Sequence, residues 1–131
     1  MKVVLDSNVL LAAFATRGLC GAEMTACLNA HQLAISQHIL DEIQRNLTGK
    51  FKMSAAEARQ RVLFLQKHAE VVEPLSVDKD ACPDGSDLPV LGTALAAGAE
   101  CLVTGDQELL SLKEFKGISI LAPRAFYDRL R

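Results

Sequence analysis

The chain begins with Lys2-Val-Val-Leu-Asp6, a short run of apolar and β-branched residues that ends in a carboxylate. A continuous apolar run of this length is typical of a strand that is buried on both faces, as in a parallel sheet. Similar short runs occur at 32–36, 71–72, 101–104 and 118–120. Helical patterns separate them, which predicts a mainly parallel sheet of about five strands with helices on both faces. The predicted fold is a single-domain, three-layer α/β/α sandwich.

The helical segments are recognised by the spacing of their apolar residues. The clearest one follows Ser54-Ala-Ala-Glu57, which has the form of a capping box. Gly49 is expected to end the preceding helix, and the polar segment 76–86 is expected to be a loop. The predicted helices are 9–14, 20–30, 37–47, 54–69, 88–97, 108–113 and 124–130.

Length and composition restrict the class of protein. The 131 residues correspond to one domain over 1–131, and half of them are hydrophobic, which is enough for a buried core. The net charge is −2, with no Trp and one Tyr, so contact with nucleic acid would depend on charge rather than on base stacking. The four cysteines lack zinc-site spacing and are expected to be reduced. The absence of a signal peptide or a membrane-length apolar stretch predicts a cytoplasmic protein.

Acidic residues follow the predicted strands, at the edge where parallel sheets bind ligands. Carboxylates that converge from separate elements repel one another, and a hard cation such as Mg²⁺ or Mn²⁺ supplies the missing positive charge. This placement predicts a metal site. The candidate ligands are Asp6 after the first strand, Glu42 in the helix after the second, Asp84 and Asp87 in the following loop, and Asp106 after the strand at 101–104.

Each of these acids also has a simpler explanation. Asp6, Asp87 and Asp106 each stand where an Asp could cap the helix that follows. Glu42 could be an ordinary solvated helix residue. Capping and metal binding are compatible roles, and it is the joint placement of the acids that favours a metal site.

Four segments follow one another along the chain around the candidate acids. They are Val4-Leu-Asp-Ser-Asn-Val-Leu10, Ser36-Gln-His-Ile-Leu-Asp-Glu42, Asp87-Leu-Pro-Val-Leu-Gly-Thr-Ala94 and Leu102-Val-Thr-Gly-Asp-Gln-Glu-Leu-Leu110. In this order they resemble the PIN domain family, in its bacterial and archaeal branch of toxin–antitoxin toxins (VapC-like ribonucleases). A closing segment, Ile120-Leu-Ala-Pro-Arg-Ala-Phe126, extends the resemblance over nearly the whole chain.

The resemblance implies an endoribonuclease that depends on Mg²⁺ or Mn²⁺, with RNA as substrate, an antitoxin protein as a possible partner and a homodimeric state. By position, the acidic quartet would be Asp6, Glu42, Asp87 and Asp106, with Asp84 as an auxiliary acid. Supporting hydrogen bonds would come from Asn8, Ser36 and Thr104. Relatives often have two adjacent acids where this chain has Ser86-Asp87. The choice of third acid therefore lies between Asp84 and Asp87, and the spacing to Thr93-Ala94 favours Asp87.

Two other functions are considered. The first is a catalytically weak binding module that acts through an antitoxin or a homodimer partner. The second is a phosphatase with Asp6 as nucleophile, but such enzymes have a second Asp two residues later, where this chain has Asn8. Basic residues could form a phosphate-facing rim, although a solvated helix face is the favoured explanation, because charged residues normally fill such faces. They are Arg17, Lys50, Lys52, Arg59, Arg61 and Lys67.

Overall fold

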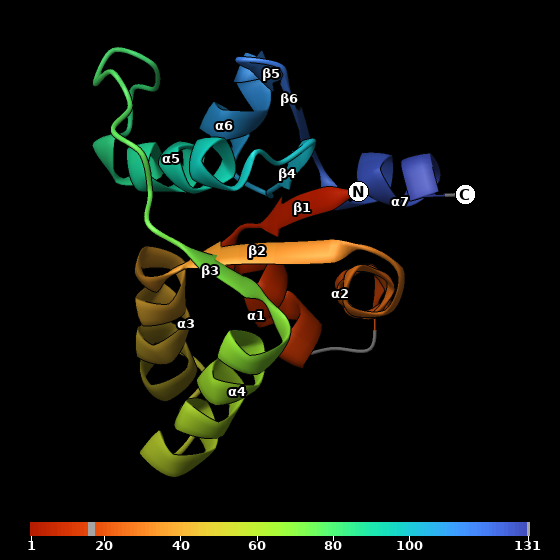
Figure 1. Cartoon of the computed structure of the whole chain (residues 1–131). Helices are drawn as coiled ribbons and strands as arrows, with labels where there is room; N and C mark the ends of the chain where they lie inside the picture. Colours follow the sequence, from red (N-terminus) through yellow and green to blue (C-terminus); the bar gives the residue numbers. More distant parts are fainter. Residues whose placement is uncertain (16–17, 131) are drawn as a thin grey trace.

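The computed structural model describes residues 1–15 and 18–130, and it is an α/β sandwich built on one sheet (Figure 1). The strands are β1 (Lys2–Leu5), β2 (Gln32–Ser36), β3 (Glu70–Val72), β4 (Cys101–Val103), β5 (Glu114–Phe115) and β6 (Ile118–Leu121). The helices are α1 (Ser7–Ala15), α2 (Leu19–Ala30), α3 (Gln37–Gly49), α4 (Ala55–His68), α5 (Leu88–Ala97), α6 (Gln107–Leu112) and α7 (Pro123–Leu130), with a 3₁₀ turn η1 (Gly85–Asp87) before α5.

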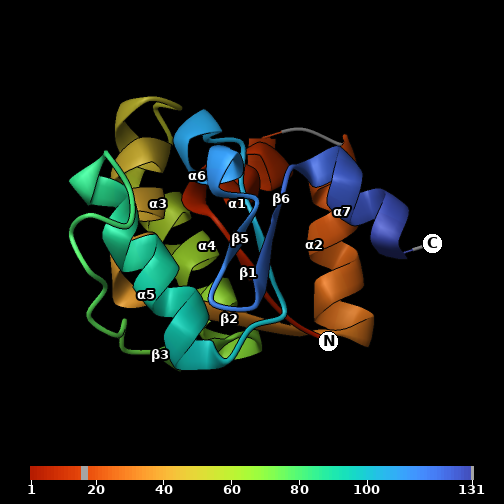
Figure 2. The same ribbon diagram turned by 90° about the horizontal axis from the view of Figure 1, so that it is seen from above.

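The six strands lie in the order β3-β2-β1-β4-β6-β5, and every neighbouring pair except β5–β6 is parallel. Helices α1 to α4 lie on one side of this sheet, and α5 and α6 lie on the other (Figures 1 and 2). The predicted α/β/α class is therefore confirmed. The strands β1, β2 and β4 bury nearly all their side chains, as continuous apolar runs require.

The prediction of about five strands missed β5. This two-residue strand forms an antiparallel hairpin with β6, with Phe115 paired to Ile118. The two turn residues, Lys116 and Gly117, both have positive φ, at 49° and 85°. A tight hairpin needs this conformation at both positions, but Lys seldom adopts it, so Lys116-Gly117 is a weak turn signal in the sequence.

The helix boundaries agree with the prediction to within one residue, apart from the start of α1, which lies at Ser7 rather than at 9, and the end of α3. Gly49 was expected to stop this helix, yet it forms the last residue of the helix, and Lys50 follows as the C-terminal cap. The expected capping box is present, because the Ser54 side chain accepts a hydrogen bond from the Glu57 backbone N–H at 3.2 Å. Among the described residues no single helix is both long and apolar enough to cross a membrane; only the strongly bent pair α1 and α2 reaches that length and composition together.

Candidate metal centre

The topology places the candidate site between β1 and β4. Chain order in the sheet reverses at this pair, because β1 connects toward β2 and β3 while β4 connects toward β6. Such a reversal leaves a crevice outside the carboxyl ends of the two strands, where open α/β sheets bind ligands. Asp6 directly follows β1, and Asp106 follows β4 after Thr104 and Gly105.

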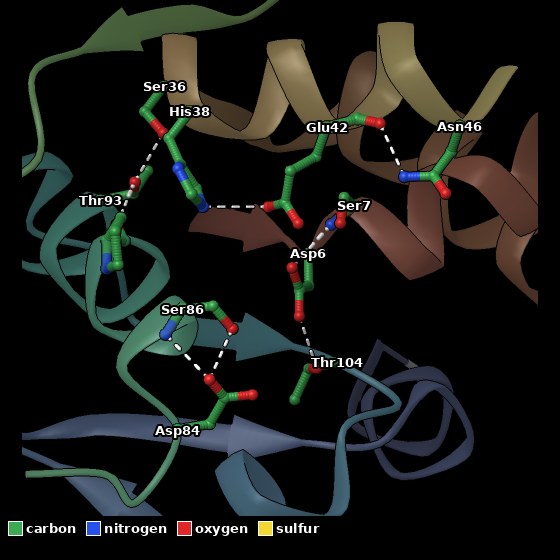
Figure 3. Close-up of polar contacts among 11 residues, drawn as sticks. Asp6, Ser7, Ser36, His38, Glu42, Asn46, Asp84, Ser86, Thr93 and Thr104 are labelled. Atoms are coloured by element: carbon green, nitrogen blue, oxygen red, sulfur yellow. Dashed lines mark hydrogen bonds and ion pairs between the residues drawn. The ribbon is translucent and has the colours of Figure 1, made fainter. Parts of the chain in front are cut away.

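Asp6 is held by two hydrogen bonds and is 5% exposed. Its Oδ1 atom accepts from the Ser7 backbone N–H at 2.7 Å, and its Oδ2 atom accepts from the Thr104 hydroxyl at 2.8 Å (Figure 3). The Thr104 hydroxyl in turn accepts from the Asp106 backbone N–H at 3.0 Å. Thr104 thus links the ends of β1 and β4, as the predicted supporting role requires.

Asp106 also caps α6. Its Oδ1 atom accepts from the backbone N–H groups of Glu108 at 2.8 Å and Leu109 at 3.3 Å. Capping and a place at the site therefore coexist at this residue, since the second carboxylate oxygen is not used by the cap. Asn8 supports the same loop, because its Oδ1 accepts from the Gly105 backbone N–H at 3.2 Å.

Glu42 reaches the site from α3, on the side of β2. Its Oε1 atom lies 3.1 Å from Nε2 of His38, one helical turn earlier (Figure 3). The pKa of Glu42 is raised mainly by burial, and His38 opposes this shift while Asp6 adds to it. His38 is not among the candidate residues of the sequence analysis, although its four-residue spacing to Glu42 on a helix is a signal that both side chains share one face.

Asp87 lies at the junction of η1 and α5 and is 7% exposed. The buried thiol of Cys82 lies 3.7 Å from its Oδ2 atom as a hydrogen-bond donor. Cys82, Asp87 and Glu108 each offer a ligand atom, and these atoms lie within 4.8 Å of one another. Neither Cys82 nor Glu108 was predicted, because a loop and a separate helix bring them together only in the folded chain.

Asp84 differs from Asp87 in its exposure and in its hydrogen bonds. It is exposed, and its Oδ1 atom accepts from both the backbone N–H and the hydroxyl of Ser86, at 2.9 and 2.7 Å (Figure 3). These hydrogen bonds lower the pKa of Asp84. Asp84 caps η1, whereas Asp87 makes no side-chain cap to α5, so capping does not explain the position of Asp87.

Ser36 does not contact any of these acids through its hydroxyl. This group hydrogen-bonds to the Thr93 hydroxyl at 2.7 Å, and both residues are buried (Figure 3). The contact joins the end of β2 to α5, the helix that Asp87 precedes. Ser36 therefore supports the relative position of β2, which leads into the helix of Glu42, and α5, which follows Asp87, rather than an acid directly.

Electrostatic interactions link the four acids to one another. The pKa of Asp6 is raised by burial and, further, by Asp106. The pKa of Asp87 is raised to about 6, first by burial and then by Asp106, Asp84 and Asp6. Together with the effect of Asp6 on Glu42, these interactions connect the whole quartet. A group of two buried and two half-buried carboxylates that forms no ion pair with Lys or Arg among the described residues fits Mg²⁺ or Mn²⁺.

The third acid can be identified by substitution. We expect Asp87→Asn to weaken Mn²⁺ binding by roughly a hundredfold, because it removes a buried carboxylate of the cluster. The matched variant Asp84→Asn should change the affinity less than about threefold, since Asp84 is exposed and engaged with Ser86. Isothermal titration calorimetry with Mn²⁺ measures both. A larger loss for Asp84→Asn than for Asp87→Asn would reverse the assignment.

Solved structures share this architecture. VapBC2 from Rickettsia felis, bound to a DNA fragment from its promoter, aligns with a TM-score of 0.64 and 17% identity over 93% of this chain and 98% of that chain. VapBC-1 from nontypeable Haemophilus influenzae aligns with a TM-score of 0.66 and 18% identity over 95% and 99%. PAE2754 from Pyrobaculum aerophilum aligns with 0.65 and 20% over 99% and 89%. At these identities the similarity demonstrates the fold.

The family itself is identified from the sequence. No curated protein matches the chain. A family model described as PIN domain, a family that is generally made up of nucleases, matches residues 2–108. This match includes all four acids and the strands that position them. The chain belongs to the PIN domain family.

Proposed function

We propose that this protein is an endoribonuclease that hydrolyses RNA phosphodiester bonds with Mg²⁺ or Mn²⁺ bound by Asp6, Glu42, Asp87 and Asp106. The convergence of these four acids at the crevice between β1 and β4, within a PIN domain, is the observation that supports it. Asp84, Asn8 and Thr104 would assist at the edge of this site. Among the described residues, ligand atoms of Cys82, Asp87 and Glu108 lie within 4.8 Å of one another, so this group shares Asp87 with the proposed site.

The bound cation would polarise a non-bridging phosphate oxygen and lower the pKa of a water molecule. The chain itself would hold the reacting groups. Thr104 and Ser7 fix the Asp6 carboxylate, and the cap on α6 fixes Asp106. One of the carboxylates at the site would orient or accept the proton of the attacking water. Hydrolysis then forms one bond from water oxygen to phosphorus and breaks one P–O bond.

We further propose that the protein is the cytoplasmic toxin of a toxin–antitoxin pair and forms a homodimer. The VapBC structures that share its fold support an antitoxin partner. A half-open, largely apolar groove of about 470 Å³ lies between α1, α2 and α4, and it is a surface that a protein partner could cover. It is lined by Ala13, Phe14, Met24, Gln60, Arg61 and Phe64.

Arg61 belongs to this groove rather than to a phosphate-facing rim. Its guanidinium lies 6.0 Å from the centre of the Phe14 ring, at the distance of a cation–π contact. Arg17, another residue of the predicted basic rim, lies outside the described residues. The proposed RNA contact therefore depends on the acidic site and its cation more than on a basic helix face.

Turnover on structured and single-stranded RNA tests the proposal. Cleavage should require Mg²⁺ or Mn²⁺, stop with EDTA and return when the metal is restored. Cleavage that continues in EDTA would refute metal dependence. If Mn²⁺ binds but no RNA is cleaved, the second candidate, a binding module that acts through the α1–α2–α4 groove, becomes the better description.

Metal binding should depend on pH because the ligands must lose protons. With the pKa of Asp87 raised to about 6, lowering the pH from 7 to 5 should weaken Mn²⁺ binding by roughly tenfold or more. Asp6 and Glu42 shift in the same direction and should steepen the effect. In the absence of metal, protonation of Asp87 favours the folded state. The contribution of Asp87 to the stability of the fold therefore falls as the pH rises from about 4 to about 6. Calorimetry at three pH values measures the affinity; a constant affinity would contradict the prediction.

A further inference from the structure

We propose that His38 is a positioning residue, which holds the Glu42 carboxylate in the orientation that a divalent cation requires. This inference rests on the proposed function, because it assigns a role at the same site. His38 lies in α3 and is not one of the proposed metal ligands. The contact between its ring and Glu42 carries the inference.

The geometry follows from the local structure. Strand β2 ends at Ser36 and α3 begins at Gln37, so His38 lies in the first turn of the helix. Glu42 comes four residues later, on the same face. The Nε2 atom of His38 lies 3.1 Å from Oε1 of Glu42, with the two side chains 31% and 28% exposed. Figure 3 shows Glu42 between His38 on one side and Asp6 on the other.

The Nε2 atom of His38 faces the protein rather than solvent, although part of the ring is exposed. Its Nε2 atom is shielded from solvent and has no well-aligned hydrogen bond among the described residues. A buried polar atom without a partner is costly, and the Glu42 carboxylate is the polar group beside it. When the Glu42 carboxylate is held beside the ring, it also gives the Nε2 atom of His38 a polar partner.

Glu42 needs such a neighbour more than the other acids do. Asp6 accepts from Ser7 and Thr104, and Asp106 accepts from two backbone N–H groups. Glu42 has a longer side chain with one more rotatable bond, and ordering it costs more conformational entropy. Among the described residues, only His38 forms an ion pair with the Glu42 carboxylate. One oxygen facing His38 leaves the other free to face the cation.

The test compares Mn²⁺ affinities, measured by calorimetry and by the electron paramagnetic resonance signal of free Mn²⁺. We expect His38→Phe to weaken binding by roughly tenfold to a hundredfold, the usual effect of losing a group that orients a ligand. His38→Gln can place an amide N–H near the position of Nε2 and should restore most of the affinity. His38→Asn is too short and should not. The matched control His68→Phe alters a histidine that contacts Phe64 in α4, and its affinity should equal that of the wild type.

Each result has a defined meaning. Unchanged affinity in folded His38→Phe would overturn the proposal, as would equal affinities of His38→Gln and His38→Asn. If His38→Phe does not fold, the comparison of the Gln and Asn variants decides. Failure of the proposed function would look different, because the wild-type protein itself would then bind no Mn²⁺.

Discussion

Replacing Asp6 with Asn should reduce RNA cleavage by roughly a thousandfold or more, because it removes the central charged ligand of the proposed metal centre. Asp6 is the acid that interacts with the other three: it repels Glu42 and Asp87, and Asp106 repels it. Asn keeps nearly the same shape and can still accept the Ser7 N–H, so the fold around β1 should survive. Rates at saturating Mn²⁺ measure the effect.

The same substitution should stabilise the protein when metal is absent. Burial and Asp106 raise the pKa of Asp6, which means that the charged form is disfavoured in the folded state. A neutral Asn avoids this cost at pH 7, so the melting temperature without metal should rise while cleavage falls. Loss of activity through unfolding would lower both quantities, and the opposite signs therefore separate the two causes.

Asp41→Asn is the matched control for this prediction. Asp41 precedes Glu42 on α3 but is exposed and accepts a hydrogen bond from Gln37. Its substitution should leave cleavage and metal binding unchanged. Full activity in Asp6→Asn, measured with the same RNA, would eliminate Asp6 as a metal ligand.

Gly92→Ala should cause the largest loss of stability, about 2–4 kcal/mol in the free energy of unfolding. Gly92 lies in α5, where the chain after β3 crosses the helix. A Cβ atom at this position would lie 2.2 Å from the Leu75 carbonyl oxygen and 3.2 Å from Cβ of Pro74. The first contact is with backbone, which cannot rotate away as a flexible side chain does.

The close approach also makes a specific bond. The Leu75 backbone N–H donates to the Gly92 carbonyl at 3.0 Å, so moving the two segments apart breaks a hydrogen bond as well. For a domain of this size the melting temperature should fall by roughly 10 °C. Because α5 follows Asp87, we also expect weaker Mn²⁺ binding in this variant.

Gly49→Ala provides the control, since a Cβ there meets no atom within 4 Å. Gly49 is the last residue of α3, where Ala should be neutral or should stabilise the helix by up to about 1 kcal/mol. Chemical denaturation of both variants and the wild type measures the difference. A stability for Gly92→Ala within about 0.5 kcal/mol of the wild type, the usual range for a surface substitution, would contradict the predicted clash.

Short patterns of apolar and capping residues were sufficient to predict most of the strands and helices. The apolar runs located β1, β2, β4 and β6, and the capping box located the start of α4. The prediction failed at β5, where an unfavourable Lys occupies a positive-φ turn position, and it differed slightly at the end of α3, where Gly49 is the last helical residue rather than the residue after the helix. In both cases the cost of the local conformation is small enough for neighbouring contacts to offset it.

The order of strands and acids along the chain is sufficient to predict that the acids at the strand ends lie near one another, because parallel strands bring their carboxyl ends to one edge of the sheet. Asp6, the residue that ends the first apolar run, could be placed in that way. The tertiary structure alone decided that Asp87 rather than Asp84 is buried there, that His38 faces Glu42, and that Cys82 and Glu108 lie beside Asp87. The physical reason is that these contacts depend on side-chain direction and on the paths of loops. The spacing of residues along the chain determines neither the direction of a side chain nor the path of a loop. Both depend on how the elements pack in the folded protein.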